Sequence, residues 1–325
     1  MCRRDFLTAA VALGAGTVFI VPALAQGYPT RPIKMIVGLA PGGTTDNVAR
    51  LIGQRLSSSL GRPVIIDNRP GGAGGSAGFK AAAAAASDGY TLLSATAGMT
   101  ISPALYKNVG YDPIKSFAPV AMVASSSQIL VVNAAVPAKS VPELVAYAKA
   151  NPGKVHFGSP GYGTQPHLTG EFLKLRAGID IIHVPYRGSA PAVNDLLAGQ
   201  IQMMLDAGPT VLPQIEAGKL RALAVTGEGR NQNMPDVPTM IESGFPGFTT
   251  RYWNGVVAPA GTPDVIGNKL HAAINEQLKS PDMQASLAKV GLEPTVMSPQ
   301  DFAVFIAAET QKWAAVVKAA GIKIE

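Results

Sequence analysis

The sequence has almost none of the residues that support covalent, redox or metal chemistry. Its 325 residues include one cysteine, Cys2. Cys2 lies in a leader that we expect to be removed, so the mature chain should have no cysteine, which excludes disulfide bonds and thiolate catalysis. The four histidines show no metal-ligand spacing; they are His156, His167, His183 and His271. We therefore expect neither a metal site nor a cofactor.

Charge is also scarce. Charged residues make up 15% of the chain and hydrophobic residues 47%, a composition typical of a globular protein without a disordered tail. The formal net charge is +6, but the basic residues are scattered, with no run longer than Arg3-Arg4. We therefore expect no nucleic-acid partner, whereas a mildly positive field favours small anions.

The first 25 residues have the pattern of a cleaved signal peptide rather than of a membrane-spanning helix. Arg3-Arg4 precedes an apolar run from Phe6 to about Val21, and the small residues Ala23-Leu24-Ala25 stand before Gln26. This pattern predicts export to the periplasm. The arginine pair resembles a twin-arginine signal, but ordinary export signals also carry paired arginines, so both routes stay open.

The length favours two domains, and the order of elements favours an α/β fold. After the leader, strands are expected at 33–38, 64–67 and 91–94, with helices at 44–58 and 76–86. This βαβαβ order predicts a parallel sheet covered on both faces. A second α/β unit follows. Its expected strands are 155–158, 180–184, 201–205 and 220–226. The capping-box pattern Ser140-Val141-Pro142-Glu143 predicts a helix that ends at about 150, and further helices are expected at 165–176, 190–198 and 211–216.

The chain is expected to cross between the two units twice. A long β-prone run, 120–132, can leave one sheet and enter another. The strand 251–258 and three helices that start near Pro263, Pro281 and Pro299 return to the first unit. We predict a signal peptide at 1–25, a first domain at 26–122 and 228–325, and a second domain at 123–227. The crossings, near 120–126 and 224–230, place a cleft at the strand ends of both sheets, where such folds bind ligands.

A glycine turn between the first strand and the first helix is the first candidate site. Its residues are Ala40, Pro41, Gly42, Gly43, Thr44, Thr45 and Asp46. The glycines let the backbone approach a ligand, and the first turn of the helix leaves N–H groups unpaired at the positive end of the helix dipole. Such a turn binds anions. The alternative is a plain connection whose free amides are capped by Asp46.

A second loop, 158–167, repeats this pattern in the other half of the chain. It follows a strand, precedes a helix, and contains Ser159, Gly161, Gly163, Thr164 and His167. Two anion-binding loops that face each other across a cleft suit a molecule with one or two carboxylates.

Four further residues are expected to contact the ligand. They are Ser94, Thr96, Tyr186 and Asp206. Asp206 ends an apolar strand at the cleft, where it either accepts a hydrogen bond from a ligand hydroxyl, amine or water, or caps the next helix.

The richest glycine segment, 68–78, is interpreted as structural. Gly72, Gly74 and Ala77 fit only a relaxed dinucleotide fingerprint. The segment follows the second strand, no acidic residue ends the strand 91–94, and the G-K-[ST] ending of a P-loop is missing. We therefore favour a turn that feeds a closely packed helix.

We expect no catalytic residues. The nucleophile motif G-x-S-x-G is missing, because Phe157 stands where its first glycine belongs before Gly158-Ser159. The rival interpretation is a periplasmic hydrolase that uses the same cleft. It has only Ser159 with His167 as nucleophile and base, without an orienting acid.

The two loops resemble those of the Bug family, the solute receptors of tripartite tricarboxylate transporters. Further similar segments follow in order through the chain, at 68–75, 184–192, 220–226 and 235–239. The resemblance implies an α/β, two-lobed periplasmic binding protein of type II (a Venus flytrap with two crossover strands) that is not an enzyme and closes on a carboxylated organic anion.

The resemblance also implies how the anion is held and who receives it. In relatives the first loop, here 40–46, holds a carboxylate largely through waters and backbone amides. The second loop contributes Ser159, Gly161, Gly163, Thr164 and His167, although Gln165 stands where many relatives have a small residue. The implied partner is the membrane permease of a tripartite tricarboxylate transporter, served by a monomeric receptor. The alternative is a ligand sensor for a signalling protein.

Overall fold

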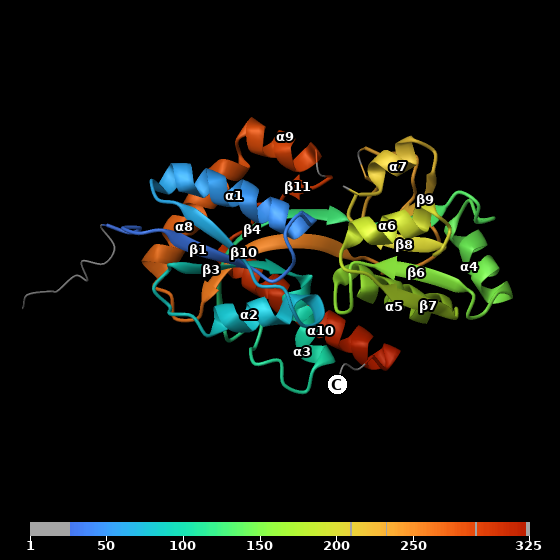
Figure 1. Cartoon of the computed structure of the whole chain (residues 1–325), viewed down its shortest axis with the longest axis horizontal. Coiled ribbons are helices and arrows are strands. Elements are labelled where there is room, and N and C mark those ends of the chain that lie inside the picture. The colour runs from blue at the N-terminus through green and yellow to red at the C-terminus, as the bar shows by residue number, and fades with distance from the viewer. Residues whose placement is uncertain (1–26, 209, 232, 290, 323–325) are drawn as a thin grey trace, which may run out of the picture.

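The structure is a computed structural model of the chain and describes residues 27–208, 210–231, 233–289 and 291–322. The predicted signal peptide, 1–25, lies outside the described residues. The helices and strands form two α/β lobes, each built on one sheet (Figure 1). The predicted two-lobed α/β architecture is confirmed.

The first lobe begins with three parallel strands in the order β2-β1-β3, as the alternation of strands and helices predicts. Successive side chains of a strand point to opposite faces. Met35 therefore packs with Ile52 on one face, and Ile36 packs with Phe79 on the other. The elements are β1 (Ile33–Val37), α1 (Thr44–Leu60), β2 (Val64–Asn68), a short 3₁₀ turn (Ala73–Gly75), α2 (Ser76–Ala83) and β3 (Thr91–Thr96). Helix α2 is shorter than predicted and ends at Ala83.

Helix α3 (Ala97–Leu105) follows β3 directly and was not predicted from the sequence. Gly98 and Pro103 give it a low helix propensity. Met99, Ile101 and Leu105 are fully buried in the core of the first lobe, which α10 also lines. Tertiary packing therefore stabilises this helix where the local sequence disfavours it.

Antiparallel strands complete the first sheet, so the sheet is mixed rather than purely parallel. They are β4 (Phe117–Ser127), β10 (Arg251–Pro259) and β11 (Glu293–Pro294), in the overall order β11-β4-β10-β3-β1-β2. The β-prone run 120–132 does leave one sheet for the other, as predicted. It is divided at Gln128, just beyond the predicted interval, and β5 (Ile129–Asn133) continues in the second sheet.

The second sheet has the strand order β7-β6-β8-β5-β9. Strands β6, β7 and β8 run parallel, and β5 is antiparallel to β8 and β9. The remaining elements are α4 (Val141–Ala150), β6 (Val155–Ser159), α5 (Gln165–Ala177), β7 (Ile181–Pro185), α6 (Ser189–Leu197), β8 (Met203–Asp206), α7 (Leu212–Glu216) and β9 (Leu220–Val225). Ser140 caps α4 by accepting a hydrogen bond from the Glu143 N–H, in agreement with the capping pattern.

The return to the first sheet is longer than expected. Met240 and Phe248, which lie between β9 and β10, are buried in a core with Phe157 and Leu223 of the second lobe. The chain therefore changes sheets only at Arg251, where β10 begins. The division into domains at 122/123 and 227/228 stays a prediction, but residues 234–248 pack with the second sheet.

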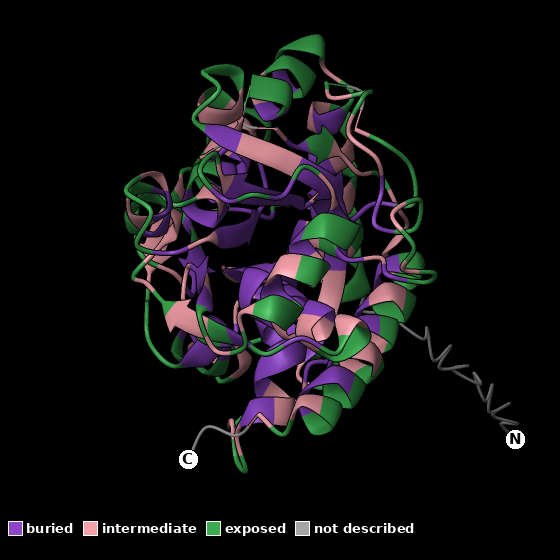
Figure 2. Ribbon diagram, turned by 90° about the vertical axis from the view of Figure 1, so that its right-hand side faces the viewer, coloured by how far each residue is buried: buried purple, intermediate pink, exposed green. Residues whose placement is uncertain are grey.

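Three C-terminal helices cover the first sheet, as predicted. They are α8 (Asp264–Leu278), α9 (Pro281–Lys289) and α10 (Pro299–Ala320). Leu270 and Ile274 of α8 share a core with α1, whereas Phe302 of α10 packs against Trp253 on the opposite face. Figure 2 shows the outcome: buried residues gather where the helices face the sheets, and the outer faces of the helices are exposed.

Candidate functional site

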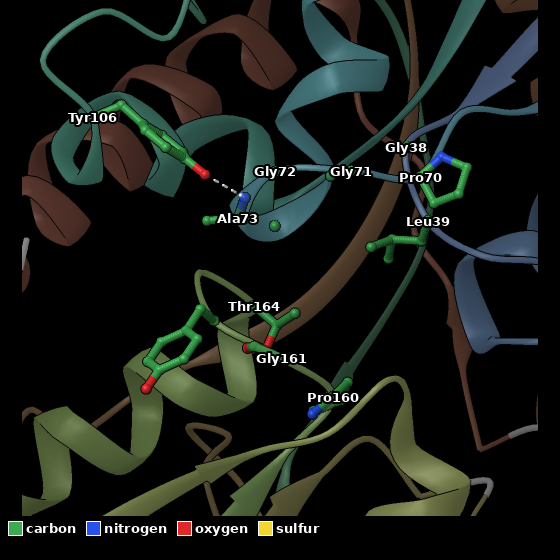
Figure 3. Close-up of a pocket in the computed structure, with 13 residues that line it drawn as sticks. Gly38, Leu39, Pro70, Gly71, Gly72, Ala73, Tyr106, Pro160, Gly161 and Thr164 are labelled. Atoms are coloured by element: carbon green, nitrogen blue, oxygen red, sulfur yellow. Dashed lines mark hydrogen bonds between the residues drawn. The ribbon is translucent and has the colours of Figure 1, made fainter. Parts of the chain in front are cut away.

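The two sheets meet at the ends of their strands, and three loops lie at their junction. Loop A, residues 40–46, leads from β1 into α1; loop B, residues 70–75, leads from β2 into α2; loop C, residues 158–167, leads from β6 into α5. A cavity of about 600 Å³ separates loops B and C (Figure 3). Its walls are Gly38, Leu39, 70–75 and Tyr106 from the first lobe, and Pro160, Gly161, Tyr162 and Thr164 from the second.

Loop A offers exposed backbone at the N-terminus of α1. Gly43 is the N-cap residue, and no side chain caps the helix. The N–H groups of Thr44 and Thr45 lie in the first turn, where no intrahelical acceptor exists. Because this end of the helix also carries the positive pole of its dipole, the geometry suits an anion.

Asp46 holds loop A in place through hydrogen bonds. Its carboxylate is 2% exposed and accepts hydrogen bonds of 2.9 Å from the Gly42 N–H, from Arg50 Nε and from Asn68 Nδ2. Burial alone would raise the pKa of Asp46, but the three hydrogen bonds outweigh it and lower that pKa below its ordinary value. Asp46 thus occupies one amide of the loop, as the alternative interpretation allowed, and leaves the first turn of α1 without a side-chain cap.

Loop C, in contrast, bonds its own amides. The Gly161 N–H donates to Ser159 Oγ (3.2 Å), and the Gly163 N–H donates to His167 Nδ1 (3.2 Å). Both the N–H and the hydroxyl of Thr164 donate to the Gly161 carbonyl, at 3.4 and 2.7 Å. The backbone amides of Gly161 and Gly163, which were expected to be free for an anion, are therefore bonded within the loop. Only the uncapped first turn of α5 resembles loop A.

Two histidines, the buried His167 and the half-buried His183, support loop C. Ser159 is completely buried, and its Oγ lies 2.6 Å from His183 Nε2 on the neighbouring strand β7. The rings of His183 and His167 lie against each other with centroids 4.0 Å apart. Burial lowers the pKa of His167 to about 4, and burial together with the neighbouring His167 lowers the pKa of His183 to about 3. Both rings are therefore neutral at pH 7.

The serine–histidine pair considered for a hydrolase is wrong. Ser159 is bonded to His183 rather than to His167, whose Nδ1 accepts from Gly163. No side chain among the described residues bonds His183 Nδ1, so an orienting acid is missing there. Since the serine is also closed off from solvent, the arrangement positions a loop and does not present a nucleophile.

Loop B agrees with its structural interpretation but also touches the second lobe. The Gly74 N–H donates to the Tyr162 carbonyl of loop C at 3.0 Å. Gly74 has a φ of +62°, and a Cβ there would lie 2.6 Å from the Gly163 carbonyl oxygen, so only glycine permits this approach. The Ala73 N–H donates to the Tyr106 hydroxyl at 2.7 Å, which fixes loop B from the other side (Figure 3). Contacts between segments so far apart leave no local signal in the sequence.

The other predicted contacts lie at different places along the strand ends. Ser94 and Thr96 are buried at the end of β3. The Tyr186 hydroxyl turns to α6 and donates to Asp195 at 2.8 Å. Asp206 is 4% exposed, and its two oxygens accept hydrogen bonds of 2.7 Å from the Ala207 N–H and the Thr210 hydroxyl. Burial raises the pKa of Asp206, which caps the segment that follows β8.

Tyr252 makes a contact with loop A that the sequence did not reveal. It stands near the start of β10, and its hydroxyl lies 2.9 Å from the Thr45 hydroxyl of loop A. Burial raises the pKa of Tyr252, and the charge of Asp206 in the second lobe adds to the rise. Tyr252 therefore connects β10 to loop A. The sequence predicted only a strand at 251–258 and gave no sign that Tyr252 contacts loop A.

Neither metal binding nor membrane spanning is indicated in the part of the chain that the structure describes. There, no group of three or more His, Cys, Asp or Glu side chains could hold a metal ion. Within the same residues, no helix is both long enough and apolar enough to cross a membrane.

Comparison with known proteins gives consistent results. Residues 48–322 match the family model described as tripartite tricarboxylate transporter family receptor. The chain is 42% identical to the protein BugT of Bordetella pertussis over 306 residues, 94% of each chain. It is similar to the periplasmic binding protein BugD, with a TM-score of 0.83, 37% identity and coverage of 91% of this chain and 100% of that one. MatC of Rhodopseudomonas palustris, solved with bound malate, has a TM-score of 0.81, 32% identity and coverage of 89% and 100%.

Proposed function

Because this chain belongs to the tripartite tricarboxylate transporter family of receptors, we propose that it binds a small organic carboxylate in the cleft and delivers it to a membrane permease of that transporter type. The chain is a solute receptor rather than an enzyme, as are its family and its structural neighbours. The pair formed by Ser159 and His183 agrees with this, because the serine is buried away from solvent.

The observation that best supports a carboxylate ligand is the uncapped N-terminus of α1. Residues 38–46 contain no lysine or arginine. The nearest basic residue of α1, Arg50, is bonded to Asp46. An anion at loop A would therefore be held by the N–H groups of the first turn and the helix dipole rather than by an ion pair.

The neighbouring structures support the type of solute and the location. MatC of Rhodopseudomonas palustris holds malate, and BugD is a periplasmic binding protein. We extend both properties to this chain: a dicarboxylate in the cleft, and a monomeric receptor in the periplasm after cleavage between Ala25 and Gln26. The intact mass of protein taken from the periplasm tests the cleavage site.

Titration calorimetry of the mature chain, 26–325, tests the ligand class. We expect succinate and L-malate to bind, and succinamide, the neutral diamide of succinate, to bind at least about 10-fold more weakly, because a charge-assisted hydrogen bond contributes roughly 1.5–3 kcal/mol. Succinamide has almost the same shape as succinate, so it isolates the effect of charge. Equal binding of the acid and the diamide, or binding of neither acid, would contradict the proposal.

The delivery step needs a separate test in cells. Deleting the gene should abolish uptake of labelled dicarboxylate, and expression of the parent chain should restore it. A variant that binds no dicarboxylate should not restore uptake. Undiminished uptake in the deletion strain would separate this receptor from transport.

A further inference from the structure

A short row of polar side chains lies on one face of β4 and β10, and Tyr252 in this row contacts Thr45 of loop A. Tyr252 pairs with Ser126, and Asn254 pairs with Ala124. Directly opposed residues of an antiparallel pair point to the same side of the sheet, and so do residues two apart in one strand. Ser126, Tyr252 and Asn254 therefore share a face. It is the face covered by α1, because Ala124 and Tyr252 pack in one core with residues of that helix.

Asn254 is the unusual member of this row. It is 1% exposed, yet neither its Oδ1 nor its Nδ2 has a hydrogen-bond partner among the described residues. The neighbouring Ser126 Oγ is buried and unpartnered in the same way. Buried polar groups are nearly always hydrogen-bonded, and an unpaired one destabilises the fold. The Tyr252 hydroxyl lies near Asn254, and this neighbour acts to lower the pKa of Tyr252, but the two groups form no hydrogen bond of normal geometry. The Asn254 carboxamide and the serine hydroxyl can therefore still bond to a ligand.

The position of Asn254 connects this row to the proposed binding site. Across β3, Asn254 pairs with Thr96, one of the expected ligand contacts. Two residues earlier in β10, Tyr252 reaches Thr45 of loop A. Asp206, the other polar group near Tyr252, already has a donor on each oxygen. Asn254 thus has the free donor and acceptor that Asp206 lacks.

We propose that Asn254 is a specificity-determining residue that recognises a hydroxyl group next to a ligand carboxylate. The inference rests on the proposed function and deepens it. A carboxamide offers a donor and an acceptor side by side. An α-hydroxycarboxylate presents the matching pair, because its hydroxyl can donate to Oδ1 while a carboxylate oxygen accepts from Nδ2. A methylene in place of the hydroxyl leaves Oδ1 unpaired, so the unhydroxylated acid binds less tightly.

L-malate and succinate differ by this one hydroxyl group and are the probes for the test. The parent should bind L-malate more tightly than succinate by about 10-fold, since a neutral hydrogen bond contributes roughly a 2- to 12-fold change in affinity. In Asn254→Leu, which is similar in volume, the ratio of the two affinities should fall to about 1. The succinate affinity should also fall, because the carboxylate loses the Nδ2 donor, and the malate affinity should fall further because its hydroxyl loses Oδ1.

Asn275→Leu is the matched control. Asn275 lies on α8, and its Oδ1 is likewise buried and unpartnered among the described residues, while its Nδ2 pairs with His271. This variant tests whether loss of any buried carboxamide changes the ratio, and it should leave the malate preference of the parent intact. If Asn254→Leu does not fold, a crystal structure of the parent with L-malate provides the same test, because the hydroxyl should lie within hydrogen-bond distance of Asn254 Oδ1.

The outcomes separate the two proposals. A malate preference that survives Asn254→Leu, or a malate hydroxyl bound elsewhere in the crystal, overturns the inference. A parent that binds both acids equally also overturns it but leaves the proposed function standing. A parent that binds neither acid overturns both.

Discussion

Loops A and C look alike in the sequence and differ in the structure. Each joins a strand to a helix through glycines and hydroxyl residues, and neither helix has a side-chain cap. Loop A exposes Gly42 and Gly43 and gives one amide to Asp46. Loop C bonds the amides of Gly161 and Gly163 to Ser159 and His167. A glycine-rich turn is therefore an open anion site only when no side chain within reach accepts its N–H groups.

The difference suggests that the two loops do different work. Loop A has backbone to offer to an anion. Loop C uses its amides for internal hydrogen bonds, is supported by two neutral histidines and is joined to loop B through Gly74. Substitutions at the exposed glycines of loop A should therefore act on affinity at constant stability, whereas substitutions at the glycines of loop C should act on stability first.

The largest effect is expected from His167 of loop C and from His183 of β7, which packs against it. In the folded chain the pKa of His167 is about 4 and that of His183 about 3, whereas an unfolded histidine titrates near 6.5. Below pH 6.5 the unfolded chain binds protons that the folded chain does not. Stability is therefore complete above pH 6.5 and is lost as the pH falls toward 4, by on the order of 3 kcal/mol per histidine.

Urea unfolding at pH 7.5, 6 and 5 measures this loss. The double variant His167→Gln/His183→Gln should flatten the profile between pH 6.5 and 5, even if it starts from a lower stability. A parent profile that is already flat over this range would show that the two histidines bind protons as readily in the folded chain as in the unfolded chain.

The carboxylate of loop A should give the next largest effect. Asp46→Ala removes the acceptor of three hydrogen bonds and should lower the free energy of unfolding by about 2–3 kcal/mol. Because the folded pKa of Asp46 is lowered, its contribution is present above its ordinary pKa of 3.8 and is lost as the pH falls through the folded value. This window lies below the main part of the histidine loss, so pH-dependent unfolding separates the two loops. Asp46→Asn keeps one oxygen acceptor and should lose less than Asp46→Ala.

Two glycine substitutions compare the loops directly. At Gly43 an added Cβ would have only the Ala40 oxygen near it, at 3.9 Å, and the backbone conformation suits any residue. Gly43→Val should therefore keep the stability of the parent but hinder ligand approach to the Thr44 amide, with a loss of about 10- to 150-fold in L-malate affinity.

Gly161→Val should give the reverse result. Gly161 has a φ of +142°, which side-chain-bearing residues rarely adopt, so the substitution should cost about 1–3 kcal/mol of stability. The affinity of the folded fraction for L-malate should change less than in Gly43→Val. Thermal unfolding and calorimetry on both proteins give the four values needed. Equal losses of affinity would support the sequence-based prediction that both loops bind the anion.

The sequence predicted the architecture well because strands and helices follow from local periodicity. It predicted the alternating elements of both sheets and the crossing in 120–132. It missed α3, where Gly98 and Pro103 argue against a helix that burial of Met99 and Ile101 nevertheless stabilises. For the site, glycine patterns located both loops but could not show which amides stay free. That depends on which side chain each amide reaches in three dimensions: Asp46 in loop A, and Ser159 and His167 in loop C. The supporting contacts of His183 and Tyr252 come from other strands and have no local signature.

The smallest effect is expected at the contact between loop A and β10. The Tyr252 and Thr45 hydroxyls lie 2.9 Å apart, so Tyr252→Phe removes one neutral hydrogen bond and should cost about 1 kcal/mol of stability. Thr45→Val removes the same bond from the other side, and the double variant should lose little more than either single one. A coupling energy near 1 kcal/mol in this cycle, from urea unfolding, would show that β10 helps to hold loop A. Because the amides of the first turn of α1 stay in place, each single variant should lose less than about 10-fold in L-malate affinity. A larger loss than that of Gly43→Val would mean that the tyrosine hydroxyl itself binds the ligand, and that β10 rather than loop A dominates binding.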